Sequence, residues 1–129
     1  MKYFEIKKEL EILELSESLK KNRDFQNVYK YGKSYANKYL VMYIIKNDLK
    51  KNRIGVSVSK KVGNSVVRHR LTRLIRESFR LNGDKLQCGW DIVVIARNTA
   101  KGRNYWDIDS AILHLVKLHR ILDEKMIEE

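Results

Sequence analysis

The sequence predicts an α+β fold with two layers, in which a mixed sheet of about four strands is covered by helices. Segments with a helical spacing of apolar residues alternate with segments rich in β-branched and aromatic residues, in the order helix, three strands, helix, strand and helix. The chain has 129 residues, 43% of them apolar and 33% charged, which is the profile of one globular domain. We expect this domain over residues 19–122, after an acidic amphipathic extension (1–18) and before an acidic tail (123–129).

The first helix of the domain is predicted from about Asn22 to Tyr31. Asn22 is a favourable N-cap, and Asp24 would lie in the first turn, where the helix dipole stabilises a negative charge. Gly32 is a favourable residue at which to end the helix. The extension over residues 1–18 also contains helix-forming residues with an apolar face, and we expect helical character there.

Four segments predict strands through their β-branched and aromatic residues. Residues 38–46 are apolar on both alternating faces, so they belong inside the sheet, whereas 53–61 alternates larger apolar residues with small ones. Residues 90–97 form an apolar run that is typical of a buried strand. A further short strand is expected over 33–37, and residues 47–52 form a turn.

Two longer helices complete the predicted fold. The better defined one covers residues 61–81, with Asn64 or Ser65 as its N-cap and Asn82-Gly83 at its end. The other runs from about Trp106 to Ile121, where apolar residues recur at helical spacing.

The charge of the chain is strongly positive and unevenly distributed. There are 27 Lys and Arg against 16 Asp and Glu, a net charge of +11. Residues 1–17 carry a net −2 and residues 123–129 a net −3, which leaves +16 on residues 18–122. Such an excess indicates a polyanionic partner, although charge alone does not distinguish RNA, DNA and a membrane surface. No apolar run approaches the length of a membrane span, and we expect a soluble cytoplasmic protein.

One face of the predicted helix over 61–81 is almost purely basic. On a helical wheel, the side opposite the apolar stripe carries the basic residues. The stripe consists of Val67, Leu71, Leu74, Ile75 and Ser78, and the basic side of His69, Arg70, Arg73, Arg76 and Arg80, with Arg68 at its flank and Lys60 and Lys61 ahead of the helix. Guanidinium groups match phosphate oxygens, so this face predicts nucleic-acid binding. The alternative is a solvated basic face, but such faces usually interleave acids, and only Glu77 does so here.

Aromatic residues offer a second means of binding nucleic acid. Phe25, Tyr29, Tyr39 and Tyr43 lie in the first helix and the strand that follows it. Exposed rings stack on unpaired bases, as single-strand binders use them. Each ring alone is more often part of a core, and the residues themselves leave both interpretations open.

Three blocks of the sequence resemble a known family. The run SVSKKVGNSVVRHRLTRLIRESFR (57–80) resembles the signature of the protein subunit of bacterial ribonuclease P. Residues 19–43 resemble the N-terminal segment of that family, and residues 90–100 its later strand. The blocks follow in order across residues 19–122 without large insertions, which makes the resemblance specific.

The resemblance implies a fold and a role. The fold is that of the second domain of ribosomal protein S5, with a left-handed β-α-β crossover. The family member is a non-catalytic subunit of the ribonuclease P holoenzyme, an endoribonuclease whose chemistry belongs to a catalytic RNA and its magnesium ions. The implied partners are that RNA and the 5′ leader of precursor tRNA, and neither DNA nor a membrane is expected.

The resemblance also assigns roles to particular residues. The leader-binding cleft would be lined by Phe25, Tyr29 and Tyr43. The residues that would face the catalytic RNA and the leader near the cleavage site are Lys60, Lys61, Asn64, Arg68, His69, Arg70, Arg73, Arg76 and Arg80. Two positions depart from the family pattern, which usually has Asn where this chain has His69 and often Lys where it has Thr72. The acidic extension is a third departure.

Three other functions fit the sequence less well. A protein-only nuclease needs clustered carboxylates or a paired histidine, but His114 and His119 lie about 140° apart on a helix, and we expect surface or packing roles for them. Cys88 has no metal-site partners and is expected to be an unpaired thiol. A general RNA-binding protein fits the charge equally well, and only the motif match separates it. A DNA-binding helix-turn-helix is disfavoured by the predicted strands.

Overall fold

A computed structural model describes residues 16–123, which have the predicted α+β fold. The elements in chain order are β1 (Ser16–Ser18), α2 (Asn22–Tyr31), β2 (Lys33–Ala36), β3 (Leu40–Lys46), β4 (Asn52–Ser57), α3 (Ser65–Asn82), the 3₁₀ turn η1 (Gly83–Lys85), β5 (Trp90–Ala96), η2 (Asn98–Ala100) and α4 (Tyr105–His119). The predicted order of helices and strands is confirmed, with β1 as an additional strand at its start. None of the helices within residues 16–123 is long and apolar enough to cross a membrane.

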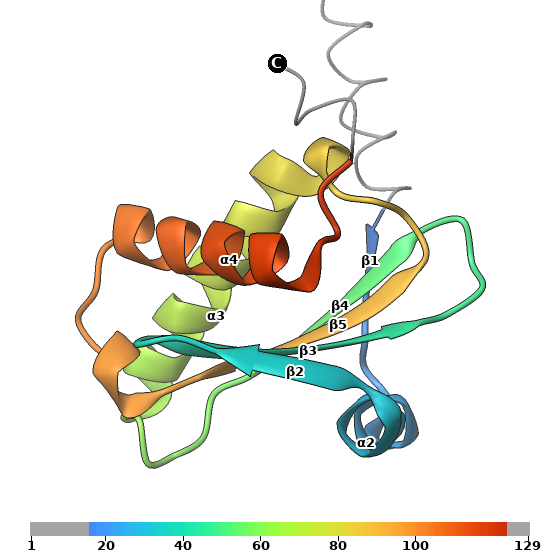
Figure 1. Ribbon diagram of the computed structural model, residues 1–129. Helices are drawn as coiled ribbons and strands as arrows, with labels where there is room; N and C mark the ends of the chain where they lie inside the picture. Colours follow the sequence, from blue (N-terminus) through green and yellow to red (C-terminus); the bar gives the residue numbers. More distant parts are fainter. Residues whose placement is uncertain (1–15, 124–129) are drawn as a thin grey trace, which may run out of the picture.

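The five strands form one mixed sheet in the order β1-β4-β5-β3-β2. β3 runs antiparallel to β2 and β5, whereas β4 runs parallel to β5 and β1. Because β4 and β5 are parallel neighbours, the chain has to cross over between them, and α3 makes that crossing (Figure 1). The expected sheet of about four strands gains a fifth because Ser16–Ser18 pairs with the start of β4.

Helices cover the two faces of the sheet unequally. α3 and α4 lie over one face, and α2 lies against the other (Figure 1). On β3, Leu40, Met42 and Ile44 point into the larger core beneath α3 and α4. Tyr43 and Ile45 alternate with them and pack in a smaller cluster with α2. The α2 side is therefore the thinner layer, and several of its apolar side chains stay half-exposed.

The last three residues of the predicted N-terminal extension differ from the helical character expected for them. Ser16–Ser18 form a strand rather than a helical segment, because their backbone pairs with β4. Residues 1–15 of the predicted extension and residues 124–129 of the predicted tail lie outside the described residues. Asn22 is the first residue of α2 and not its cap, a position that Lys21 occupies without a side-chain hydrogen bond.

α3 begins at Ser65, four residues after the predicted start. Asn64 has an extended backbone (φ −70°, ψ 179°), and its side chain accepts a hydrogen bond of 3.0 Å from the Val67 N–H. Asn64 therefore caps the helix and prevents it from extending backwards. Lys60 and Lys61 lie in the turn that precedes this cap.

Two other elements end earlier than predicted. α4 ends at His119 rather than Ile121, because Arg120 adopts a left-handed conformation with φ 59°. β4 ends at Ser57, where its pairing with β5 stops and the chain turns towards α3.

Gly32 ends α2 as predicted, although it does so through close packing rather than an unusual backbone angle. Its φ of −79° is ordinary. A Cβ at this position would lie 2.4 Å from the carbonyl oxygen of Val28 and 2.9 Å from that of Ile44. No side chain fits there, so the end of α2 can lie directly on β3.

A network of charged side chains fixes α2 to the sheet. Asp91 on β5 is buried, and its carboxylate accepts hydrogen bonds from Nε and Nη2 of Arg53, at 2.8 and 2.6 Å. Asn47 donates a third hydrogen bond of 2.8 Å to Asp91. Nη1 of Arg53 lies 3.7 Å from the carboxylate of Asp24 on α2. Arg53 therefore compensates the buried charge and connects the helix to the strands.

His119 packs inside the larger core, whereas His114 is exposed, in line with the expected surface and packing roles. Nε2 of His119 lies 2.9 Å from the Met42 carbonyl oxygen, and the imidazole makes an edge contact with Tyr35, with ring centroids 4.7 Å apart. Burial lowers the pKa of His119; the hydrogen bond to Met42 opposes this shift, and the positive charge of Lys33 adds to it. Protonation would also place an N–H at Nδ1, which has no hydrogen-bond partner within the described residues.

The charged network predicts a large difference between two variants. Arg53→Met should lower the free energy of unfolding by about 3–5 kcal/mol, because Asp91 would keep a buried charge without its main partner. Asp24→Asn removes a more exposed pair and should cost about 1 kcal/mol or less. Urea denaturation measures both values. A smaller loss for Arg53→Met than for Asp24→Asn would contradict this account.

His119 predicts a pH dependence of stability. Because its folded-state pKa lies below the ordinary value of 6.5, the unfolded chain takes up the proton first as the pH falls. The contribution of His119 is therefore complete only at a pH well above the ordinary pKa of 6.5, and it is lost as the pH falls through 6.5 towards the folded-state pKa. We expect wild-type stability to fall between about pH 7.5 and about pH 5.5, and to fall less in His119→Gln, which keeps a donor for Met42. Parallel pH curves for the two proteins would rule this out.

Candidate nucleic-acid interface

α3 separates an apolar side from a basic side, as its sequence predicts. The residues buried against the sheet and α4 are Leu71, Ile75, Ser78, Phe79 and Asn82, and the predicted stripe residues Val67 and Leu74 are half-buried. The exposed basic residues are His69, Arg70, Arg73, Arg76 and Arg80. The predicted basic face is thus confirmed as exposed, because the apolar half of the helix fills the core between the sheet and α4.

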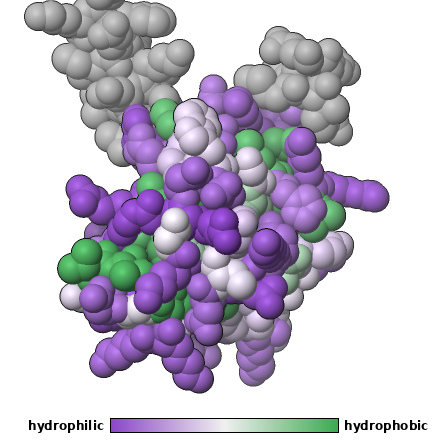
Figure 2. All heavy atoms as spheres, turned by 90° about the vertical axis from the view of Figure 1, so that its left-hand side faces the viewer, coloured by the Kyte–Doolittle hydropathy of each residue, from purple (hydrophilic) through white to green (hydrophobic). Residues whose placement is uncertain are grey.

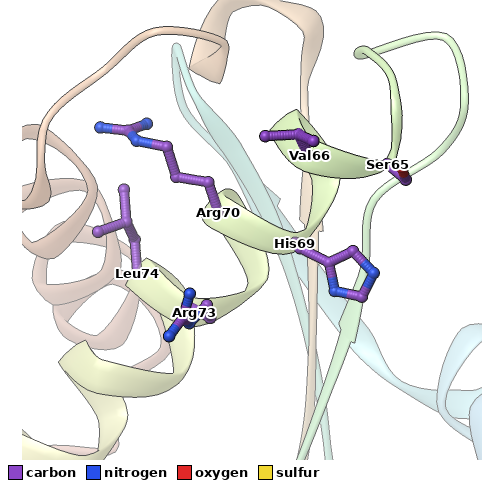
Figure 3. A pocket seen from close by; sticks show the side chains of 6 residues that line it. All are labelled: Ser65, Val66, His69, Arg70, Arg73 and Leu74. Carbon is purple, nitrogen blue, oxygen red and sulfur yellow. The ribbon is translucent and has the colours of Figure 1, made fainter.

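A shallow groove of about 600 Å³ runs along the exposed side of α3. It is lined by Ser65, Val66, His69, Arg70, Arg73 and Leu74 (Figure 3). These residues form two ridges with a spacing of four, so the groove is the space between neighbouring rows of one helix. His69 and Arg70 point to opposite sides of the helix in Figure 3. Its lining combines the apolar side chains of Val66 and Leu74 with the basic groups of His69, Arg70 and Arg73.

The guanidinium groups at the groove carry uncompensated charge. Among residues 16–123, Arg70 and Arg73 form no ion pair with a carboxylate, and both are exposed. Figure 2 views the molecule from the side of Figure 1 where α3 and α4 begin, and hydrophilic residues surround a hydrophobic patch there. Each free guanidinium presents a fork of donors that matches two oxygens of a phosphate.

Two other arginines of the predicted site make hydrogen bonds within the protein, whereas the buried Nε of Arg68 has no hydrogen-bond partner within residues 16–123. Nη1 of Arg76 donates a 2.7 Å hydrogen bond to the hydroxyl of Ser18, which connects α3 to β1. Arg80 donates two hydrogen bonds to Glu77, at 3.0 and 2.6 Å, and this bonding lowers the pKa of the Glu77 carboxyl. Arg68 is half-buried at the flank of the face, as predicted. Arg70 and Arg73 are therefore the arginines most available to an anion.

The two positions that depart from the family pattern differ in their environment: Thr72 bonds within the helix, and His69 is exposed. The Thr72 hydroxyl donates a 2.9 Å hydrogen bond to the Arg68 carbonyl one turn earlier, so it is satisfied within the helix. His69 is exposed and lines the groove. Asn64, assigned to RNA contact by the resemblance, uses its side-chain oxygen to cap α3.

The predicted aromatic residues gather on the opposite face of the sheet, between α2 and the strands. The rings of Tyr29 and Tyr43 make an edge contact with centroids 5.2 Å apart, and Phe25 lies 6.3 Å from Tyr29. All three are half-buried, so each contributes to the smaller core and also leaves ring surface open. A Cβ on Gly55 would lie 2.7 Å from the Phe25 ring, so glycine allows this ring to lie flat against β4.

Tyr39 is not part of this aromatic group. It packs against the larger core instead, and Arg103 lies over its ring, 5.2 Å from the centroid.

Within the aromatic group, burial raises the pKa of Tyr29. A hydrogen bond with Ser57 opposes this rise, and Tyr43 adds to it. The Tyr29 hydroxyl therefore keeps its proton at neutral pH and can donate a hydrogen bond.

The predicted site residues thus form two surfaces rather than one. The basic face of α3 lies on one side of the sheet and the aromatic group on the other. Lys60 and Lys61 are both exposed and lie in the turn that leads from β4 to α3. In the sequence they come after the aromatic residues and before the basic face. Sequence reasoning missed Arg53 and Asp91, which hold α2 and hence the aromatic group in place. An aspartate within an otherwise apolar strand was the signal that could have revealed them.

Comparisons with known proteins place this geometry in a family. The sequence matches the model of the family described as Ribonuclease P over residues 13–120. The ribonuclease P protein component of Lachnoclostridium phytofermentans is 64% identical over 108 residues, which cover 84% of this chain and 93% of that protein. The ribonuclease P protein component of Alkaliphilus metalliredigens is 51% identical over 110 residues, which cover 85% of this chain and 99% of that protein.

Solved structures agree with the sequence relatives. The RNase P protein of Staphylococcus aureus superposes with a TM-score of 0.77 at 39% identity, covering 82% of this chain and 97% of that one. The RNase P protein of Thermotoga maritima superposes with a TM-score of 0.74 at 36% identity, covering 79% of this chain and 96% of that one. Because both its sequence and its fold match these proteins, the chain belongs to the bacterial ribonuclease P protein family.

Proposed function

We propose that this protein is the RNA-binding cofactor subunit of a ribonuclease P ribonucleoprotein. It binds the catalytic RNA and the 5′ leader of precursor tRNA, and so promotes endonucleolytic removal of the leader to give mature 5′ ends. The observation that carries this proposal is the exposed face of α3, whose arginines Arg70 and Arg73 have no carboxylate partner among residues 16–123. Membership of the family supports it.

The basic face of α3 is suited to the catalytic RNA. Its guanidinium groups recognise phosphate pairs, and the field of the +11 chain raises the local concentration of a polyanion. Lys60 and Lys61 add charge at the helix start, where backbone N–H groups and the helix dipole also favour phosphate. Binding of this kind is sequence-independent and weakens as salt concentration rises.

The aromatic group is suited to the leader. An unpaired 5′ leader exposes bases that stack on rings, and Phe25, Tyr29 and Tyr43 are held half-open by the sheet and α2. The protonated Tyr29 hydroxyl adds a hydrogen-bond donor for a base edge or a phosphate. Lys60 and Lys61 would contact the leader on its way towards the catalytic RNA.

We assign the chemistry to the RNA and its magnesium ions. Mg²⁺ prefers oxygen ligands, whereas the polar groups that line the groove of α3 are mainly guanidinium and imidazole groups, which suit phosphate. The protein residues therefore bind and position RNA, and no protein side chain is assigned a bond-breaking role. The proposed location is the cytoplasm, where tRNA precursors are processed.

A cleavage assay tests the function directly. The purified protein is mixed with a bacterial ribonuclease P RNA at low magnesium and given a precursor tRNA. We expect the protein to be required for release of the 5′ leader, with none released by the protein alone, because the protein would offset the weak RNA binding at low magnesium. If the protein binds the RNA and never promotes cleavage, it is a general basic RNA-binding protein instead.

Two substitutions should separate the two surfaces. Arg73→Ala should weaken binding of the catalytic RNA and reduce the slope of log affinity against log salt by about 1, because one phosphate contact is lost. Phe25→Leu keeps apolar volume and should leave that binding unchanged, but lower the affinity of the holoenzyme for precursor tRNA through lost stacking. Mature tRNA, which lacks the leader, is the control ligand. Equal affinities for both variants and wild type would refute the assignment.

A further inference from the structure

An exposed tryptophan next to the basic helix is not explained by phosphate binding. Trp106, the second residue of α4, is 72% exposed. Tryptophan is on average a highly buried residue, because its large apolar surface is costly to leave in water. Trp106 lies in a strongly basic chain that we propose to bind RNA, so its exposed ring is a candidate for direct contact with RNA.

The first turn of α4 is fixed against α3. Asp109 on α4 accepts hydrogen bonds from Ser78 at 2.7 Å and from Asn82 at 2.9 Å, both on α3. The Tyr105 hydroxyl donates to the same carboxylate at 3.3 Å. Figure 1 likewise draws α3 and α4 in one layer over the sheet. Trp106 follows Tyr105 directly, so its backbone is held beside the basic helix.

The charge environment of Tyr105 agrees with this position. Burial is the main cause that raises the pKa of Tyr105; the negative charges of Asp109 and Glu77 add to the rise, and the positive charge of Arg80 opposes it. Glu77 and Arg80 belong to the outward side of α3. The Tyr105–Trp106 end of α4 therefore lies near the outward-facing Glu77–Arg80 pair in the last turns of α3.

The indole ring of Trp106 contacts the Tyr105 ring, while most of its surface is exposed to solvent. The rings of Tyr105 and Trp106 lie 5.3 Å apart between centroids and are inclined at 70°, which is an edge contact and not a stack. Such a contact restricts the orientation of Trp106 while most of its surface stays accessible. A free ring face on an ordered helix is what a stacked base requires.

The surroundings of Trp106 favour a nucleotide over an apolar protein partner. The segment that leads into α4, RNTAKGRNYW (97–106), contains Arg97, Lys101 and Arg103, whereas the nearest acids in the chain are Asp107 and Asp109, of which Asp109 is hydrogen-bonded to α3. All three cationic residues are exposed. An apolar partner would have to bury or displace these charges, whereas a nucleotide offers a phosphate for them and a base for the ring.

We propose that Trp106 is a stacking platform for an unpaired base of RNA bound along α3, so that α3 and the first turn of α4 form one continuous RNA surface. The inference rests on the proposed RNA-binding function and adds a base contact to a surface otherwise described by its charge. Exposed Val66 and half-buried Leu74 in the groove of α3 supply further apolar contact on this surface.

Intrinsic fluorescence provides a direct test, because the chain has two tryptophans. Trp90→Phe leaves Trp106 as the reporter, and the matched variant Trp106→Phe leaves Trp90, which lies at the start of β5 and packs against the core. Ribonuclease P RNA should quench the fluorescence of Trp90→Phe and leave that of Trp106→Phe nearly unchanged, because stacking on a base quenches indole emission. A leader oligonucleotide is the comparator: whichever of the two RNAs quenches Trp106 is the source of the base.

Two results would overturn the proposal, and they are distinguishable. If both ribonuclease P RNA and the leader oligonucleotide bind Trp90→Phe as tightly as wild type and neither quenches it, the platform is wrong while the proposed function stands. If neither RNA binds the wild-type protein, the proposed function fails and the platform fails with it.

Affinity measurements supply an independent readout. Trp106→Ala should lower RNA affinity roughly tenfold without changing its salt dependence, because a stack is lost and no phosphate contact is. Trp106→Phe should restore most of the affinity. Arg73→Ala, by contrast, should reduce the salt slope. Wild-type affinity in Trp106→Ala would contradict the proposal, and since the side chain is exposed, the fold of that variant is not at risk.

Discussion

The central constraint on this structure is that β5 is buried on both faces and along both edges. It pairs with β4 on one side and β3 on the other, and its side chains enter two different cores. Both faces of the sheet must therefore be covered. α3 and α4 cover one face fully, whereas the other has α2 alone, which is held in place by charged side chains. Because α2 covers this face only in part, the aromatic side chains beneath it stay half-exposed. The surface proposed to bind the leader exists for that reason.

The basic helix follows from the same constraint. α3 crosses between two parallel neighbours, and one side of it has to fill the core beneath it. Its other side faces solvent and contributes nothing to the core, so arginines are tolerated there at little cost to packing. The repulsion among them is lowered in water and would be removed when a polyanion binds. One helix can in this way serve the fold and the proposed RNA surface independently.

Much of the fold was predictable because it depends on local patterns. The two periodicities of apolar residues predicted the helices and the four longer strands, and they placed the arginines of α3 in solvent. β1 was missed because its three residues, SES, have no pattern of their own and form a strand through pairing with β4. The Arg53–Asp91 pair was missed because its partners lie 38 positions apart. Trp106 could not be recognised as exposed, since a helical apolar pattern does not say which aromatic residue faces outwards.

β1 also has a consequence for how the protein behaves in solution. Without this strand, β4 would be an edge strand whose unpaired backbone groups and apolar side chains could join the sheet of another copy. β1 takes up those groups and replaces the edge with a three-residue strand of serine and glutamate. So short and polar an edge gives a second chain little to pair with, which disfavours edge-to-edge aggregation.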